Sequence, residues 1–176
     1  MPKRTFDVRN AQPILTDRLI LQPLQISDAA EMHLVLKDAA LYAFTGGRPL
    51  QLDELQERYT KLEIGSGGKS EVWVNLIVRL ASSGVAIGYV QATIYTEEIP
   101  RADIAWVVGV SWQREGYASE AAQALVTWLQ TQGVGRIRAN IYPGHQASAG
   151  VAQRLGMHPT EILVDGETQW ELSAAL

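Results

Sequence analysis

The chain has 176 residues, of which 47% are hydrophobic and 19% are charged, and its formal net charge is −4. This composition is typical of a folded protein, and the length favours one domain over residues 1–176, with residues 1–16 as an N-terminal arm. The absence of cysteine excludes disulfides and thiol nucleophiles, and the lack of a long basic run argues against a nucleic-acid partner. No apolar run is long enough to span a membrane, so we expect a cytoplasmic protein. The sequence does not distinguish a monomer from a homodimer.

The first half of the chain combines one predicted strand, two helices and a hairpin. Alternation around Leu19 and Leu21 predicts a strand over residues 18–24. Ser27 is a suitable cap for a helix to about Asp38, and apolar residues at helical spacing predict a second helix over residues 52–64 that ends at Gly65. Residues 71–80 and 85–96 flank a turn and predict a β-hairpin.

The second half alternates between strands and helices. We expect a strand over residues 102–110, an amphipathic helix over 116–133, a strand over 136–142 and a helix over 146–155. Asp165-Gly166 predicts a tight hairpin between the last two strands. The strand–helix–strand unit over 102–142 favours a parallel pair. The expected fold is α/β (α+β), with a mixed, mostly antiparallel twisted sheet of about seven strands and helices on both faces.

The most informative segment is the junction before the predicted third helix, VSWQREGYASEAA, which begins at Val110. The first amides of a helix have no internal partners and, with the helix dipole, form a site for an anion such as a phosphate. Gly116 and Ala118 leave room for phosphate oxygens near the backbone. An ordinary strand-to-helix turn also explains the glycine, and Glu115 and Glu120 oppose a phosphate unless they point away or are offset by Arg114.

The spacing Gln113-x-x-Gly116-x-Ala118 resembles the Q/R-x-x-G-x-G/A motif of the GNAT superfamily of N-acetyltransferases. Residues 112–122 and the opening LTDRLIL over residues 15–21 look like the RimJ/RimL-like branch of ribosomal-protein N-terminal acetyltransferases. The resemblance implies an acetyl-CoA-dependent enzyme with a splayed central strand pair. It also implies a set of coenzyme-binding residues: Val108, Val110, Gln113, Arg114, Glu115, Gly116, Tyr117, Ala118, Ser119, His145 and Ser148.

The segment after the fifth predicted strand carries a second part of the resemblance. Ser148, Leu155 and Gly156 match the family pattern, whereas His145 replaces the usual Asn and Met157 replaces the usual aromatic residue. An imidazole can donate a hydrogen bond as an amide does, so His145 can keep the coenzyme contact. The alternative is that His145 caps the helix or faces solvent.

The resemblance also suggests catalytic roles. Asp103 stands where relatives often carry Glu and is the candidate base, unless a water chain takes the proton. Ser148 is the candidate donor to the departing thiolate. Each has a plain alternative, as a solvated or ion-paired carboxylate and as a helix-surface hydroxyl. The candidate acceptor-binding residues are aromatic or cationic: Tyr42, Phe44, Arg48 and Trp73.

Other patterns in the chain do not suggest a different chemistry. Gly65–Ser70 lacks the first glycine of a phosphate loop, because Glu63 stands at its position, and the three histidines have no metal-ligand spacing. Two classes of function remain. One is an N-acetyltransferase acting on a peptide or small-molecule amine, and the other is a non-catalytic module that binds acyl-CoA and regulates.

Overall fold

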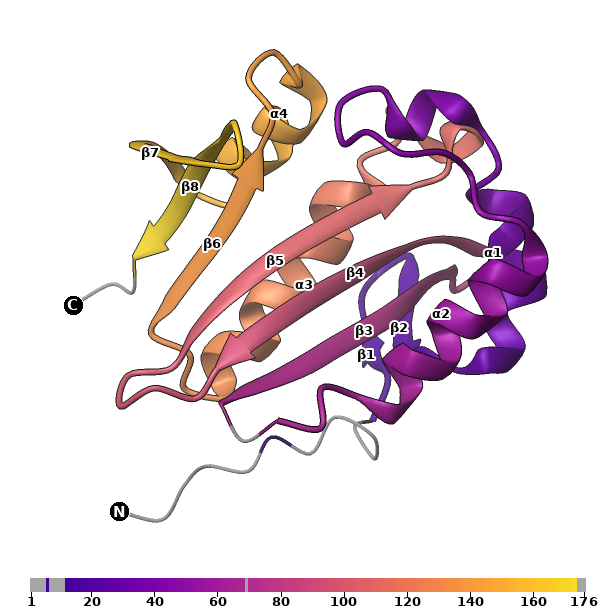
Figure 1. Ribbon diagram of the computed structural model, residues 1–176, viewed down its shortest axis with the longest axis horizontal. Helices are drawn as coiled ribbons and strands as arrows, with labels where there is room; N and C mark the ends of the chain where they lie inside the picture. Colours follow the sequence, from indigo (N-terminus) through magenta and orange to yellow (C-terminus); the bar gives the residue numbers. More distant parts are fainter. Residues whose placement is uncertain (1–5, 7–11, 69, 174–176) are drawn as a thin grey trace.

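A single sheet of eight strands, ordered β1-β2-β3-β4-β5-β6-β8-β7, organises the computed structural model, which describes residues 6, 12–68 and 70–173 (Figure 1). The strands are β1 Ile14–Leu15, β2 Leu19–Pro23, β3 Glu71–Leu80, β4 Ala86–Tyr95, β5 Arg101–Val108, β6 Arg136–Ile141, β7 His158–Val164 and β8 Glu167–Ser173. The α-helices are α1 Ala29–Val35, α2 Leu52–Ile64, α3 Tyr117–Thr131 and α4 Gln146–Arg154. Short 3-10 turns occupy η1 Ile26–Asp28, η2 Ala39–Tyr42 and η3 Val110–Trp112.

Neighbouring strands are antiparallel except β5 and β6, which α3 connects and which run parallel as expected. These two strands pair only over Arg101–Asp103 and Arg136–Arg138. Beyond Asp103 they diverge toward their carboxyl ends, and the gap between the two arrows is visible in Figure 1. The expected splayed strand pair is therefore present at the centre of the sheet.

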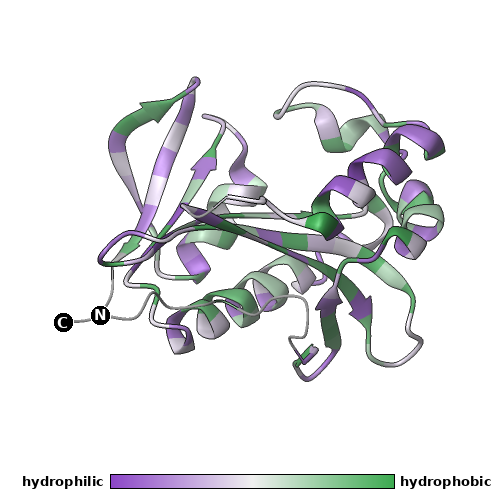
Figure 2. Ribbon diagram, turned by 60° about the horizontal axis from the view of Figure 1, so that its bottom comes forward, coloured by the Kyte–Doolittle hydropathy of each residue, from purple (hydrophilic) through white to green (hydrophobic). Residues whose placement is uncertain are grey.

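The helices cover both faces of the sheet. One apolar core joins the sheet to α3 and α4 and includes the inward residues of β3, such as Val74 and Val78. A second core joins the opposite face to α1 and α2 around Met32, Tyr59 and Ile77. Hydrophobic and hydrophilic residues alternate along the long strands (Figure 2). This pattern fits a sheet whose two faces are each only partly covered by helices.

Several boundaries differ from the sequence expectation. Residues 14–15, expected within the arm, form β1 against β2. Ser27 lies inside η1 instead of capping a helix, and the cap is made by Gln25, whose backbone amide donates to Asp28 Oδ2 at 2.8 Å. The remainder of the arm, apart from Phe6, residues 12–13 and Thr16, lies outside the described residues. Among the described helices, none has the length and apolar character needed to cross a bilayer.

The strand expected over residues 102–110 begins one residue earlier and ends at Val108. Gly109 still donates to Ile87 O at 2.8 Å, but the chain then turns into η3. A Cβ at Gly109 would lie 2.9 Å from a Val35 methyl group, so any larger residue would force neighbouring side chains to shift at this tight turn between β5 and the helical layer. Because the strand stops here, the loop that leads to α3 starts directly beside the gap.

Candidate active site

A cleft of about 1480 Å³ opens where β5 and β6 part. Its walls are the loop between α1 and α2, one side of α2, the adjoining parts of β4 and β5, the start of α3, the end of β6 and the start of α4. Twelve of the predicted site residues line it, on six different elements or loops: Tyr42, Phe44, Arg48, Val108, Gln113, Arg114, Gly116, Tyr117, Ala118, Ser119, His145 and Ser148. The fold therefore brings most of the predicted site together.

The floor of the cleft is the free backbone edge of β5. The Gly109 amide donates to Ile87 O, and Val107 lies opposite Tyr89 in the same register. The odd-numbered residues of this part of β5 therefore form the backbone hydrogen bonds to β4. Backbone groups alternate sides along a strand, so the N–H groups of Trp106 and Val108 point toward the gap left by β6. Val108 O accepts a hydrogen bond from Gln113 Nε2 at 3.0 Å, which ties the following loop to this edge.

The amino end of α3 provides unpaired backbone donors at one end of the cleft. Gly116 precedes the helix with φ +83°, a left-handed conformation that glycine adopts without strain. The first amide of the helix to find a partner in the described chain is that of Glu120, which donates to Gly116 O at 3.1 Å. The amides of Tyr117, Ala118 and Ser119 are therefore available to an anion, and the helix dipole favours negative charge there.

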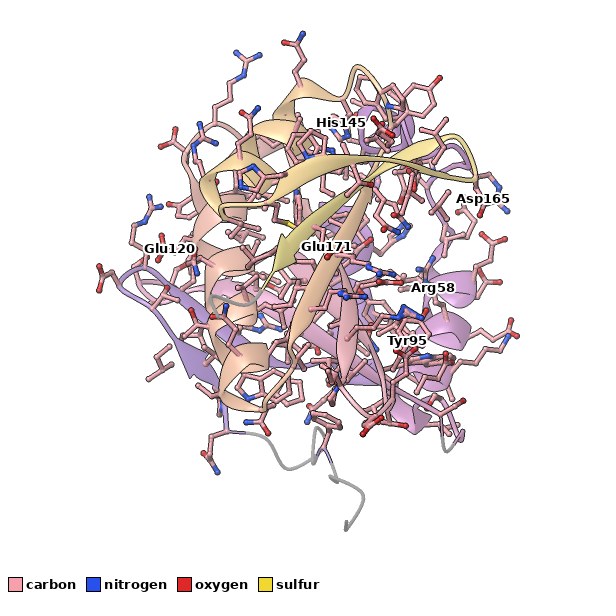
Figure 3. All side chains as sticks on the ribbon, turned by 90° about the vertical axis from the view of Figure 1, so that its left-hand side faces the viewer. Arg58, Tyr95, Glu120, His145, Asp165 and Glu171 are labelled. Atoms are coloured by element: carbon pink, nitrogen blue, oxygen red, sulfur yellow. The ribbon has the colours of Figure 1, made fainter. Side chains whose placement is uncertain are left out.

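Glu115 and Glu120, the two carboxylates expected to oppose an anion at this position, do not line the cleft. Glu120 accepts hydrogen bonds from Thr16 Oγ1 at 2.6 Å, Arg18 Nε at 2.7 Å and the Arg18 backbone amide at 3.1 Å. Burial works against the charged form of Glu120, but the hydrogen bonds from Thr16 and Arg18 together lower its pKa. Glu120 projects from α3 on the side of the sheet opposite Arg58 (Figure 3). It therefore leaves the anion site free.

Arg18 also holds the loop itself. Its Nη1 donates to Glu115 O at 3.0 Å, and its guanidinium lies over the Tyr117 ring, 4.5 Å from the centroid. The segment Thr16–Arg18, which the sequence presented as a family-like opening, is thus an anchor for the start of α3. We call the contacts of Thr16 and Arg18 with Glu115, Tyr117 and Glu120 the loop clamp. A separation of about a hundred residues hides this contact from sequence reasoning.

A cation at the anion end of the cleft was also missed from sequence. Arg154, in the last turn of α4, lines the cleft and approaches Ser119 Oγ to 3.5 Å through Nη1. The chain therefore places a guanidinium beside the free amides of α3, and this donor set matches a diphosphate. The fit to the phosphate groups of coenzyme A rests on these amides, Gly116 and Arg154.

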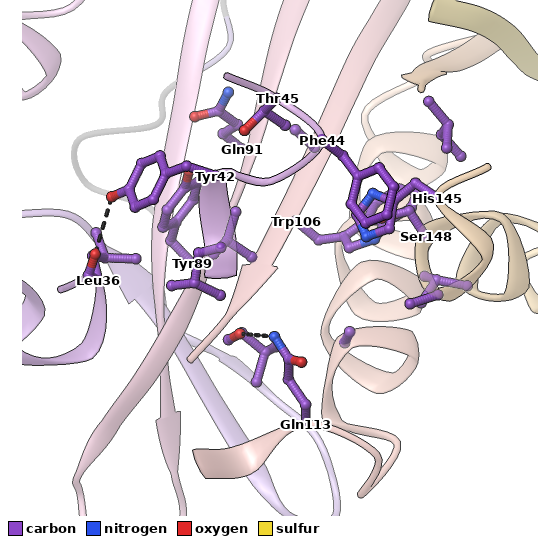
Figure 4. Close-up of a pocket in the computed structure, with 18 of the residues that line it drawn as sticks. Leu36, Tyr42, Phe44, Thr45, Tyr89, Gln91, Trp106, Gln113, His145 and Ser148 are labelled. Atoms are coloured by element: carbon purple, nitrogen blue, oxygen red, sulfur yellow. Dashed lines mark hydrogen bonds between the residues drawn. The ribbon is translucent and has the colours of Figure 1, made fainter. Parts of the chain in front are cut away.

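On the opposite wall, His145 has a role that the sequence did not predict. Its ring stacks on Phe44, with centroids 4.3 Å apart and an interplanar angle of 9°, so the α1–α2 loop meets the β6–α4 loop across the cleft (Figure 4). Burial lowers the pKa of His145. Its side chain makes no capping hydrogen bond, although it precedes α4. Ser148 lies next to it, and its hydroxyl makes no hydrogen bond within the described chain (Figure 4).

Of the predicted acceptor-binding residues, Trp73 lies away from the cleft and the others line it. Tyr42 lines the cleft and donates to Leu36 O at 3.0 Å. Arg48 lines it too, but both terminal nitrogens bond to Glu54, at 2.8 and 2.6 Å, so its charge is already paired. Trp73 does not line the cleft, and its indole donates to Glu71 Oε1 at 3.0 Å.

Asp103, the predicted base, does not itself line the cleft. It lies in the last β5 position that pairs with β6, one residue before Ile104, where the cleft begins. Burial raises the pKa of Asp103, although Arg101 and Arg138 oppose the rise.

Glu167 is the one carboxylate lining the cleft among the described residues, and burial followed by the charge of Asp165 raises its pKa. Val110 also stays outside the cleft, in η3, where its carbonyl accepts from the amide of Gln113.

Comparison with known proteins gives a consistent result. A family model for the acetyltransferase (GNAT) domain matches residues 18–158. Among curated proteins, no sequence matches the chain. Among solved structures, a GNAT-family acetyltransferase from Bacillus anthracis is similar, with a TM-score of 0.74 and 21% identity, over 92% of this chain and 98% of that one.

Two structures determined with coenzyme A share the fold. RimL, a ribosomal L7/L12 α-N-protein acetyltransferase, has a TM-score of 0.72 and 18% identity, over 93% of this chain and 98% of that chain. An aminoglycoside acetyltransferase has a TM-score of 0.70 and 18% identity, over 88% and 94%. The family match covers most of the chain, including the loop clamp from Arg18 onward and every cleft-lining residue except Glu167. The chain therefore belongs to the GNAT family of N-acetyltransferases, whose acetyl donor is acetyl-CoA.

Proposed function

We propose that the protein transfers an acetyl group from acetyl-CoA to a primary amine in the cleft between β5 and β6. The observation that carries the proposal is the end of strand pairing at Asp103, which leaves the β5 edge open beside the unpaired amides of α3. When bound, acetyl-CoA supplies an activated acetyl group that a neutral amine attacks directly at the thioester. The resemblance of residues 15–21 and 112–122 to the RimJ/RimL-like branch supports an amine that is a protein N-terminus, an amino acid or a small amine.

In this proposal, backbone groups of the chain hold the diphosphate of acetyl-CoA and polarise its thioester carbonyl. The free N–H groups of Tyr117, Ala118 and Ser119, with Arg154, hold the diphosphate. The Val108 N–H donates to the carbonyl oxygen where negative charge develops, and a fixed donor at such a position lowers the barrier. Because the backbone does this work, the side chain of Val108 remains free to pack in the core.

In this proposal, two side chains donate and accept the protons of the reaction. Ser148 Oγ, which lines the cleft and has no partner in the described chain, donates to the departing sulfur. Asp103 is not among the residues that line the cleft, although the next residue, Ile104, is. We therefore assign it the role of final proton acceptor through water, for which its raised pKa is suited. Within this proposal the chain acts in the cytoplasm as one acetyltransferase domain.

The proposal is tested by measuring thiol release from acetyl-CoA against a panel of amines, with calorimetry of coenzyme A in parallel. Turnover on at least one amine supports it. A tight coenzyme complex with no turnover on any amine would instead support the acyl-CoA-binding regulatory module.

The catalytic assignments are tested by three variants. We expect Asp103→Asn and Ser148→Ala to lower kcat by about 10- to 100-fold with little change in coenzyme affinity, a size typical of lost proton transfer. Glu167→Gln distinguishes the two carboxylates. A larger loss in Glu167→Gln than in Asp103→Asn would transfer the base to Glu167, and unchanged turnover in the first two would remove both roles.

A further inference from the structure

The acceptor half of the cleft contains a buried hydroxyl without a partner. Tyr59, on α2, lines the cleft and is only 3% exposed, and its hydroxyl makes no hydrogen bond within the described chain. Buried polar atoms are nearly always paired in folded proteins, so an unpaired hydroxyl at the wall of a cleft indicates a group that a ligand completes. Nothing in the helical spacing of α2 distinguishes this tyrosine from an ordinary core residue.

A second tyrosine, Tyr89 of β4, lies beside Tyr42 in the same part of the cleft (Figure 4). Burial raises the pKa of Tyr42, Tyr59 and Tyr89. The three phenols therefore stay protonated near neutral pH and remain able to donate. Tyr42 already donates to Leu36 O, so the phenols left without a partner in the described chain are that of Tyr89 and the fully buried hydroxyl of Tyr59.

A guanidinium accompanies these phenols. Arg58, one residue before Tyr59, lines the cleft and interacts electrostatically with Tyr42, Tyr59 and Tyr89. Within the described residues it has no ion pair, in contrast to Arg48, which Glu54 neutralises. Figure 3 places Arg58 on the face of the sheet opposite α3, so it is remote from the proposed phosphate site.

The acidic groups nearby do not cancel this charge. Asp28 is close enough to influence Tyr59, but it is paired with Arg79 at 2.7 Å. Glu167, the one carboxylate that lines the cleft in the described chain, lies on β8, beyond β6 and away from α2. An amine with several positive charges therefore finds a cation, and no carboxylate, among the residues of α2 that line the cleft. An amine that also carries a carboxylate finds a guanidinium and hydroxyl donors, the set that binds carboxylates in proteins.

We propose that the acceptor is a small amine bearing a carboxylate, an amino acid or a close relative, whose carboxylate binds Arg58 and the hydroxyls of Tyr59 and Tyr89. This inference rests on the proposed function and narrows its acceptor. It excludes polyamines and aminoglycoside-like polycations as good substrates. The amino group of such an acceptor points from α2 toward the β5 edge, where the acetyl group is presented.

The test compares matched acceptors that differ only in the carboxylate: L-phenylalanine, its amide and phenethylamine, with the same triplet for leucine. We expect kcat/KM to be at least 10-fold higher for one of the amino acids than for its amide and its decarboxylated amine. In Arg58→Gln this preference falls by about 10- to 100-fold, and in Tyr59→Phe by about 10-fold, as for lost charge-assisted and neutral hydrogen bonds. Lys61→Gln removes a charge from the same helix outside the cleft and leaves the preference unchanged.

Binding of the same amino acids to the coenzyme complex, followed by saturation-transfer NMR, separates the two claims. Turnover of amines with no preference for the carboxylate overturns this inference and leaves the proposed function standing. Binding that depends on Arg58 without turnover supports the carboxylate site at Arg58 but overturns the proposed function and, with it, the role of the bound amino acid as acceptor. Preference for an N-terminal peptide over every free amino acid, or neither binding nor turnover, overturns the inference.

Discussion

Removing Arg18 tests whether the loop clamp maintains the anion site. The Arg18→Ala variant loses the contacts of Nε and Nη2 with Glu120, the bond from Nη1 to Glu115 O, and the stacking on Tyr117. Arg18 is 46% exposed, so its ion pair contributes at most about 1 kcal/mol, and the bond to the carbonyl adds about 1 kcal/mol. We expect a loss of about 2 kcal/mol in the free energy of unfolding, which lowers Tm by roughly 4–8 °C for a chain of this size.

Coenzyme affinity reports the positioning role separately from stability. If about 1.4 kcal/mol of the clamp energy holds the amides of Tyr117 and Ala118 in place, the Kd for coenzyme A rises about 10-fold. Pantetheine, which lacks the diphosphate, binds equally well to wild type and variant. Arg18→Lys keeps the charge but not the planar fork, so its Kd lies between the two. Arg136→Ala, which removes another exposed arginine paired with an acid outside the cleft, serves as the control.

Calorimetry below the unfolding temperature of each variant provides the affinities. An unchanged Kd for coenzyme A in Arg18→Ala, or an equal loss for pantetheine, would refute the clamp as a positioning device. The pH dependence supplies a second check, because the pKa of Glu120 is lowered in the folded state. Its contribution is complete above pH 4.5 and is lost as the pH falls below that value, so the Tm difference between wild type and Glu120→Gln shrinks in acid.

Two further predictions concern the close packing of β4 against β5 at Gly88 and the contact between two loops across the cleft. Gly88→Ala places a Cβ against Val107 O and lowers Tm by more than 5 °C, a size typical of overpacking. Gly68→Ala, whose Cβ would make only an ordinary 4.0 Å contact with Ser66 O, leaves Tm within about 1 °C. Equal Tm values for the two variants would contradict the close approach of β4 and β5. NMR titration gives a pKa below 6.5 for His145, because burial disfavours the imidazolium, and Phe44→Ala raises it toward 6.5; a wild-type value at or above 6.5 would contradict the buried stack.

Much of the fold was predictable because its signals are local. Alternation gave the extent of β3 to the residue, and the Gly116 junction gave the start of α3 within one residue. The anion site followed from the same junction, since backbone amides at a helix start need no particular side chain. The gap between β5 and β6 came only through the family resemblance, because strand pairing over three residues leaves no local pattern.

What the sequence hid depends on contacts between distant segments. Glu120 counted against a phosphate site until the structure placed Arg18 and Thr16 beside it. Tyr59 was indistinguishable from core because its burial and its lack of a partner are both tertiary properties. Asp103 matched a family position by sequence, but strand register places it in the paired part of the sheet. Side-chain chemistry at a strand position cannot be assigned before the register is known.

The central claim is that the main-chain donors at the start of α3 hold the diphosphate of coenzyme A. Calorimetric titration of the purified protein with coenzyme A and, separately, with pantetheine tests it most directly. We predict saturable binding of coenzyme A and a Kd for pantetheine at least 100-fold higher, as expected for the loss of several hydrogen bonds to phosphate. No heat of binding with coenzyme A, or equal affinity for the two ligands, would contradict the account.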